Sequence, residues 1–106
     1  FAASATSIYA DPAIGFTSCF LDFGQGARIE LMACSTINKV MMAPGAQRMG
    51  LTHLALSVGS EGQVDELTGQ LARDGYPVLD APHWTGDGYY ESVVLDPDGN
   101  RVEITV

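Results

Sequence analysis

Glu30, His53 and Glu103 are the residues of this chain whose types and spacing suggest a reaction centre. Each lies in a segment where aliphatic residues alternate with small or polar ones, as in a strand that is packed on one side only. The alternation directs all three side chains away from the aliphatic face. Glutamate and histidine together suit zinc, iron, nickel, cobalt or manganese. A single glutamate in a strand is ordinarily solvated, so each of these residues taken alone leaves both interpretations open.

An internal repeat favours the metal site. Residues 15–31 align without a gap with residues 88–104, at an offset of 73 residues. The identical positions are Gly15 and Gly88, Gly26 and Gly99, Arg28 and Arg101, and Glu30 and Glu103. Two glutamates at equivalent positions, with a histidine of the same strand parity elsewhere, favour a duplicated unit with a shared site.

The elements that must position these residues are mostly strands. One helix is expected over residues 61–74, with Ser60 as its N-cap and Gly75 ending it. Strands are expected over residues 17–23, 27–33, 51–59, 77–81, 89–95 and 101–106. The second repeat unit then runs strand, helix, strand, strand, strand. The first unit is expected to lack its opening strand and helix in this sequence, because Phe1 aligns with Asp74 at the helix end.

These segments resemble the vicinal-oxygen-chelate superfamily of glyoxalases, bleomycin-resistance proteins and extradiol dioxygenases. The resemblance rests on Gly-Leu-Thr-His-Leu-Ala-Leu-Ser-Val-Gly at residues 50–59 and Asp-Pro-Asp-Gly-Asn-Arg-Val-Glu at residues 96–103. It implies an α+β fold of paired βαβββ modules that form a cupped mixed sheet. Residues 1–106 would be a single domain, with 1–33 as the remainder of the first module, 34–49 as a linker and 50–106 as the complete second module.

In the glyoxalase branch, the first and last strands of each module hold the metal. The resemblance therefore implies Glu30, His53 and Glu103 as metal ligands, and it places a fourth ligand, usually histidine or glutamine, before the first residue of this sequence. It also implies Glu103 as the catalytic base, with Glu30 as ligand or second base. Three ligands without the fourth would depart from the branch's pattern.

The implied activity is that of a divalent-metal-dependent lyase or isomerase of lactoylglutathione-lyase type, which transfers a proton next to a metal-bound carbonyl. Its substrate would be a small molecule, with a thiol such as glutathione as cosubstrate. Tyr89, Trp84 and Arg101 are candidate substrate-binding residues, Trp84 from a loop expected at the mouth of the pocket. One alternative is a non-catalytic small-molecule or drug-binding resistance protein of the same fold. Another is a vestigial or truncated module without activity.

Composition excludes several classes of partner. The formal charge is −8 with only five Lys and Arg, which argues against nucleic acid. No apolar run approaches the roughly 20 residues that span a bilayer, and no signal-peptide pattern is visible. Cys19 and Cys34 fit neither a disulfide framework nor a zinc spacing, so we expect reduced thiols in a cytoplasmic protein. A homodimer is expected because a short chain leaves a sheet edge open.

Overall fold

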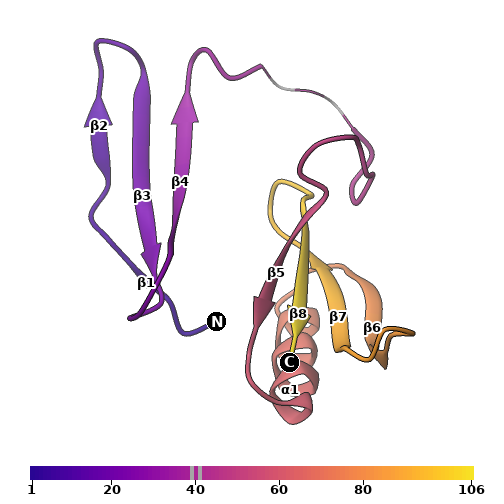
Figure 1. Ribbon diagram of the computed structural model, residues 1–106. Coiled ribbons are helices and arrows are strands. Elements are labelled where there is room, and N and C mark those ends of the chain that lie inside the picture. Colours follow the sequence, from indigo (N-terminus) through magenta and orange to yellow (C-terminus); the bar gives the residue numbers. More distant parts are fainter. Residues whose placement is uncertain (39, 41) are drawn as a thin grey trace. The chain divides into compact units, whose positions relative to one another are not determined.

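The computed structural model describes residues 1–38, 40 and 42–106. It divides the chain into two compact units, Phe1–Met41 and Met42–Val106, each built around a four-stranded sheet (Figure 1). The predicted α+β class with βαβββ topology is confirmed. The boundary between the units falls within the predicted linker, residues 34–49, of which 39 and 41 lie outside the described residues. Among the described residues, no helix is long and apolar enough to cross a membrane.

The second unit has the complete βαβββ order. Its sheet runs β5-β8-β7-β6, with β5 parallel to β8 and the other neighbours antiparallel (Figure 1). The parallel pair requires a crossover, which the helix provides. The elements are β5 (His53–Ser57), α1 (Glu61–Arg73), β6 (Val78–Trp84), β7 (Tyr90–Leu95) and β8 (Arg101–Thr105).

Both ends of α1 follow the predicted signals. The Ser60 hydroxyl oxygen accepts a hydrogen bond from the backbone N–H of Gln63 at 3.3 Å, which satisfies one unpaired donor of the first turn. Gly75 adopts a positive φ of 91°, and the next backbone N–H, of Tyr76, donates to the Leu71 carbonyl at 3.0 Å. The helix therefore ends at Arg73, within one residue of the prediction.

The core of the second unit lies between α1 and one face of its sheet. Val64 of α1 packs there with Val94 and Ile104, and all three are buried. Neighbouring strand residues point to opposite faces, so Glu103 lies on the side of the sheet away from α1. We call this side the Glu103 face. His53 belongs to it as well, because in the parallel neighbour β5 it stands two residues before Ala55, which pairs with Glu103.

The first unit repeats the hairpin of the second. Its strands are β1 (Ser4–Ala5), β2 (Tyr9–Asp11), β3 (Phe16–Asp22) and β4 (Arg28–Cys34). Phe20 pairs with Glu30 as Val93 pairs with Glu103, and the flanking pairs of the two hairpins coincide at the same offset of 73 residues. The equivalent turn residues Gly26 and Gly99 also share a left-handed conformation, with φ of 79° and 83°. Register and turn geometry thus support the duplication.

Two features differ from the sequence prediction. β6 extends to Trp84 rather than ending at residue 81, so His83 and Trp84 lie in a strand and not in a loop. Pro82 is tolerated because β6 is an edge strand, where an unpaired position needs no N–H. The short strands β1 and β2 were not predicted, since they carry no alternation of buried and exposed residues. Both cysteines are free thiols, as expected.

Candidate functional site

His53 and Glu103 form the centre of the candidate site. The parallel pairing of β5 with β8 brings them together, with His53 Nε2 3.4 Å from Glu103 Oε2. The other ring nitrogen of His53, Nδ1, lies 3.1 Å from the Thr52 hydroxyl, which helps to orient the ring. The Glu103 side chain is 18% exposed and that of His53 is 41% exposed, so the pair is open to a ligand on one side.

The geometry of this pair fits two ligands of one metal ion. Two ligand atoms that each lie about 2.1 Å from a zinc ion at a tetrahedral angle are about 3.4 Å apart. Imidazole and carboxylate are also the donor types found in catalytic rather than structural zinc sites. In the part of the chain that the structure describes, no group of three or more His, Cys, Asp or Glu is arranged to hold a metal ion. The pair therefore fits part of a site that needs a further ligand.

Glu30 lies in β4 of the first unit, at the position equivalent to Glu103. It is exposed and pairs across the hairpin with Phe20. The guanidinium of Arg28 lies 4.6 Å from the centre of the Phe20 ring, on the same face of the strands. Because Glu30 belongs to the other unit, its place beside His53 and Glu103 stays a prediction.

Glu91 is a residue of this face that the sequence analysis missed. Strand register links four polar residues in one row across the whole sheet: Ser57, Thr105, Glu91 and His83. This row lies on the Glu103 face. Burial raises the pKa of Glu91, and the charge of Glu103 and a hydrogen bond to it raise it further, while His83 acts in the opposite direction. The signal in the sequence was a single acidic residue in an apolar strand. Glu91 stands two residues before Val93, so it shares a strand face with Val93, which pairs with Glu103.

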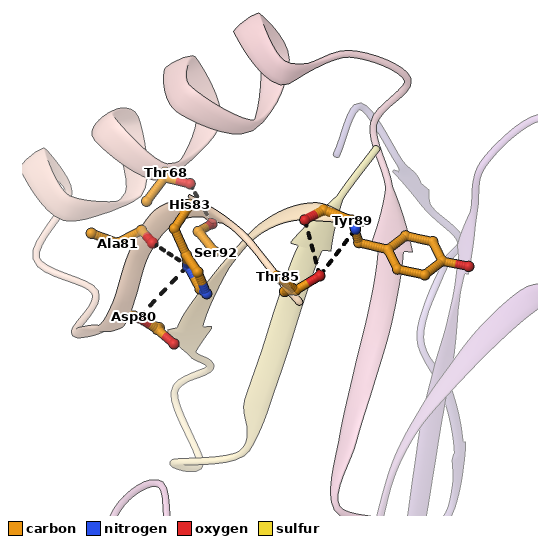
Figure 2. Close-up of polar contacts among 7 residues, drawn as sticks. All are labelled: Thr68, Asp80, Ala81, His83, Thr85, Tyr89 and Ser92. Carbon is orange, nitrogen blue, oxygen red and sulfur yellow. Dashed lines mark hydrogen bonds and ion pairs between the residues drawn. The ribbon is translucent and has the colours of Figure 1, made fainter. Parts of the chain in front are cut away.

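His83 is fixed by its own strand. Its Nδ1 lies 2.9 Å from the Ala81 carbonyl oxygen and 3.8 Å from Asp80 Oδ1 (Figure 2). When Nδ1 donates its proton to the carbonyl, Nε2 carries the lone pair of the neutral ring. His83 can then accept a hydrogen bond at the end of the polar row.

The predicted substrate residue Arg101 holds the segment before β5. Its Nε donates to the Gly45 carbonyl oxygen at 2.9 Å, and the Gly45 N–H donates to the Gly99 carbonyl at 3.2 Å. Gly45 is buried with a φ of 74°, and a Cβ there would lie 2.7 Å from Cδ1 of Leu79. Arg101 thus anchors this segment to the start of β8.

The two aromatic residues predicted to bind substrate, Trp84 and Tyr89, lie in different places in the second unit. Trp84 packs edge-on against Tyr90 at 5.5 Å, and the Tyr90 hydroxyl donates to Asp65 of α1 at 2.9 Å. Trp84 therefore lies on the α1 side of the sheet rather than on the Glu103 face. Tyr89 is exposed, and its backbone N–H donates to the Thr85 hydroxyl at 3.0 Å, which closes the turn before β7 (Figure 2).

Comparisons with known proteins agree on the family and the fold. Residues 10–104 match the family model described as Glyoxalase/Bleomycin resistance protein/Dioxygenase superfamily. The chain is 43% identical over 60 residues to the uncharacterized protein YqjT of Bacillus subtilis (strain 168), a match that covers 54% of this chain and 47% of YqjT. The chain thus spans about half the length of this curated relative.

Solved structures with the same fold include a glyoxalase I and a domain named for the wider superfamily. The glyoxylase/bleomycin resistance protein/dioxygenase domain from Frankia sp. EAN1pec matches with a TM-score of 0.77 and 18% identity, over 98% of this chain and 77% of that one. Glyoxalase I from Zea mays matches with a TM-score of 0.69 and 20% identity, over 97% of this chain and 35% of that one. At these identities the likeness shows the fold alone.

Proposed function

The chain belongs to the glyoxalase/bleomycin resistance protein/dioxygenase superfamily. We propose that it acts as a divalent-metal-dependent lyase or isomerase of glyoxalase type. The observation that carries this proposal is the His53–Glu103 pair, which presents a nitrogen and an oxygen donor 3.4 Å apart on the face opposite α1. A strand packed only for stability has no need of a half-buried glutamate at this position.

In this proposal His53 and Glu103 hold the metal, and Glu30 is the third protein ligand. When bound, a zinc, nickel, cobalt, iron or manganese ion supplies Lewis-acid polarisation of the substrate's oxygen atoms. Arg101 contributes indirectly, because its hydrogen bond to the Gly45 carbonyl holds the segment before β5 against the start of β8.

Glu103 also acts as the base. Its side chain is 18% exposed, so it is accessible to a substrate. It takes the proton from the carbon next to the carbonyl and returns it to the neighbouring carbon, with Glu30 as the second base. The substrate class is the hemithioacetal of an α-ketoaldehyde and a thiol.

The second candidate is a binding protein without turnover. The matched family model covers bleomycin resistance proteins as well as glyoxalases, and such a protein binds a small molecule on the same fold. It would require neither Glu103 nor a metal.

Elemental analysis of untagged protein, beside Glu103→Gln, separates the two candidates. The lyase proposal expects near-stoichiometric transition metal that falls at least tenfold in the variant, together with loss of turnover of the methylglyoxal–glutathione hemithioacetal. Glu66→Gln is the matched control, since Glu66 is exposed on α1 and carries the same charge. Wild-type protein that cannot be loaded with metal would instead support the binding protein.

We also propose that the protein is a cytoplasmic homodimer, as the sequence predicts. A short chain with exposed strand edges gains from pairing with a second copy. Analytical ultracentrifugation measures the mass, and a monomer at micromolar concentration would contradict the dimer.

A further inference from the structure

His53 and His83 differ in the group that lies beside Nδ1 of each ring. For His83 this group is the backbone carbonyl oxygen of Ala81, at 2.9 Å. For His53 it is the side-chain hydroxyl of Thr52, at 3.1 Å. A carbonyl oxygen can only accept a hydrogen bond, whereas a hydroxyl can donate or accept one. The contact at His83 therefore fixes the proton of the neutral ring on Nδ1, and the contact at His53 is compatible with a proton on either ring nitrogen.

In the metal-free protein, Glu103 favours one of these two positions of the proton at His53. Nε2 of His53 lies 3.4 Å from Glu103 Oε2. The charge of the carboxylate attracts a proton on Nε2, whereas a lone pair on Nε2 would face the lone pairs of the carboxylate. With the proton on Nε2, Nδ1 carries the lone pair of the neutral ring, and the Thr52 hydroxyl donates to it.

A metal ion held by His53 and Glu103 requires the other position of the proton. The ion takes the lone pair of Nε2, so the proton of the neutral ring must be on Nδ1. This N–H then needs an acceptor, and a histidine that binds a metal almost always has one at its second nitrogen. The Thr52 hydroxyl becomes the acceptor by turning about its C–O bond, and neither side chain has to leave its place.

We propose that Thr52 is a positioning residue that allows the neutral ring of His53 to change tautomer when a metal ion binds, with the proton on Nε2 before binding and on Nδ1 after it. This role rests on the proposed function, since it concerns the metal site of that function. Water accepts the proton from Nε2 and returns one to Nδ1, so the ring stays neutral and the number of protons does not change. Because the Thr52 hydroxyl lies beside Nδ1 in both states, Nε2 stays directed toward Glu103.

Nitrogen-15 NMR of the imidazole rings tests the change of tautomer, because a ring nitrogen has a different chemical shift when it carries a proton, a lone pair or a metal ion. The chain is measured at about pH 8.5, where an ordinary imidazole is neutral, without metal and with Zn²⁺. We expect the proton of His53 on Nε2 without metal and on Nδ1 with Zn²⁺. His83 should keep its proton on Nδ1 in both spectra and is the internal reference. A His53 proton on Nδ1 in the metal-free protein, or one that stays on Nε2 with Zn²⁺, would overturn the proposal.

Substitution of Thr52 tests whether its hydroxyl contributes to metal affinity. Thr52→Val keeps the shape of the side chain and removes the acceptor of the Nδ1 proton, so the dissociation constant for Zn²⁺ should rise about tenfold. Thr52→Ser retains the hydroxyl and should bind Zn²⁺ as the wild type does. Thr17→Val is the matched control, since Thr17 is an exposed threonine of β3, and it should leave the dissociation constant unchanged. Circular dichroism checks that all three variants are folded.

Competition with a fluorescent zinc chelator gives these dissociation constants, and turnover of hemithioacetals is measured separately. Equal affinity of the wild type and Thr52→Val for Zn²⁺ would remove the role of Thr52 and leave the lyase proposal in place. The expected order of affinities without turnover of any hemithioacetal would retain the role of Thr52 and lose the reaction. A wild-type protein that binds no Zn²⁺ would overturn both.

Discussion

A buried pair of hydroxyl groups joins α1 to β7, and its removal should show strong non-additivity. Thr68 Oγ1 lies 2.6 Å from the Val64 carbonyl oxygen. It also lies 2.6 Å from Ser92 Oγ (Figure 2). Because a hydroxyl has one hydrogen, Thr68 donates to the carbonyl and accepts from Ser92. Ser92 is fully buried and Thr68 is 4% exposed, so water cannot replace either partner.

The magnitudes follow from what each substitution leaves behind. Thr68→Val keeps the shape of the side chain and leaves the Ser92 hydroxyl without a partner, at a cost of about 1–3 kcal/mol. Ser92→Ala leaves the Thr68 hydroxyl its bond to the Val64 carbonyl, so it should cost less, about 0.5–1.5 kcal/mol. The double variant removes both polar groups. Its free energy of unfolding should lie about 1–2 kcal/mol above the value that adding the two losses predicts.

Urea denaturation followed by fluorescence measures this cycle. Trp84 is the single tryptophan and packs on Tyr90 in the second unit, so its emission reports the unit that contains the pair. Ser57→Ala removes an exposed hydroxyl from β5 and should change stability by less than about 0.5 kcal/mol. Additive losses, or a Thr68→Val variant as stable as the wild type, would refute the assignment of donor and acceptor.

Two other changes have outcomes that the structure determines. Gly45→Ala should lower the free energy of unfolding by about 1–3 kcal/mol, because it puts a side chain at a φ of 74° and a Cβ 2.7 Å from Cδ1 of Leu79. Its control is Gly62→Ala, at a position of α1 where a Cβ would meet no other atom, and it should raise the free energy of unfolding by about 0.5–1 kcal/mol. Equal urea midpoints for these two variants would contradict the packing at Gly45. Burial raises the pKa of Glu91 in the folded state, so the folded protein binds a proton at this carboxylate more tightly than the unfolded chain does. The protein therefore loses stability as the pH rises from the ordinary carboxyl range through this raised pKa. Glu91→Gln in metal-free protein should remove that loss and thus gain relative to the wild type between acid and neutral pH; parallel pH profiles of the urea midpoint would count against the shift.

The elements that depend on local signals could be predicted from the sequence. α1 begins and ends within one residue of its expected limits, because Ser60 and Gly75 determine its termini through contacts within a few residues. The two hairpins also followed, since each tight turn sets the register of its flanking strands. That register is what places Glu30 and Glu103 at equivalent positions.

Features that depend on pairing between distant segments were missed. β6 continues through Pro82, which ordinarily ends a strand, and only its position at the sheet edge makes this possible. The placement of Trp84 on the α1 side follows from its pairing with Tyr90. Glu91 became part of the site only when the register of β7 with β8 was known, because alternation in one strand does not identify its neighbours.

The hydrogen bonds at Gly45 determine where this chain can be divided. The repeat suggests a fragment that starts at residue 50, which would leave Arg101 without its carbonyl partner and uncover Leu79 and Leu95. A fragment that starts at Met42 retains the segment that covers them. The duplicated unit and the compact structural unit therefore begin at different residues, and a fragment cut before Met42 keeps the hydrogen bonds at Gly45 that a fragment cut at residue 50 loses.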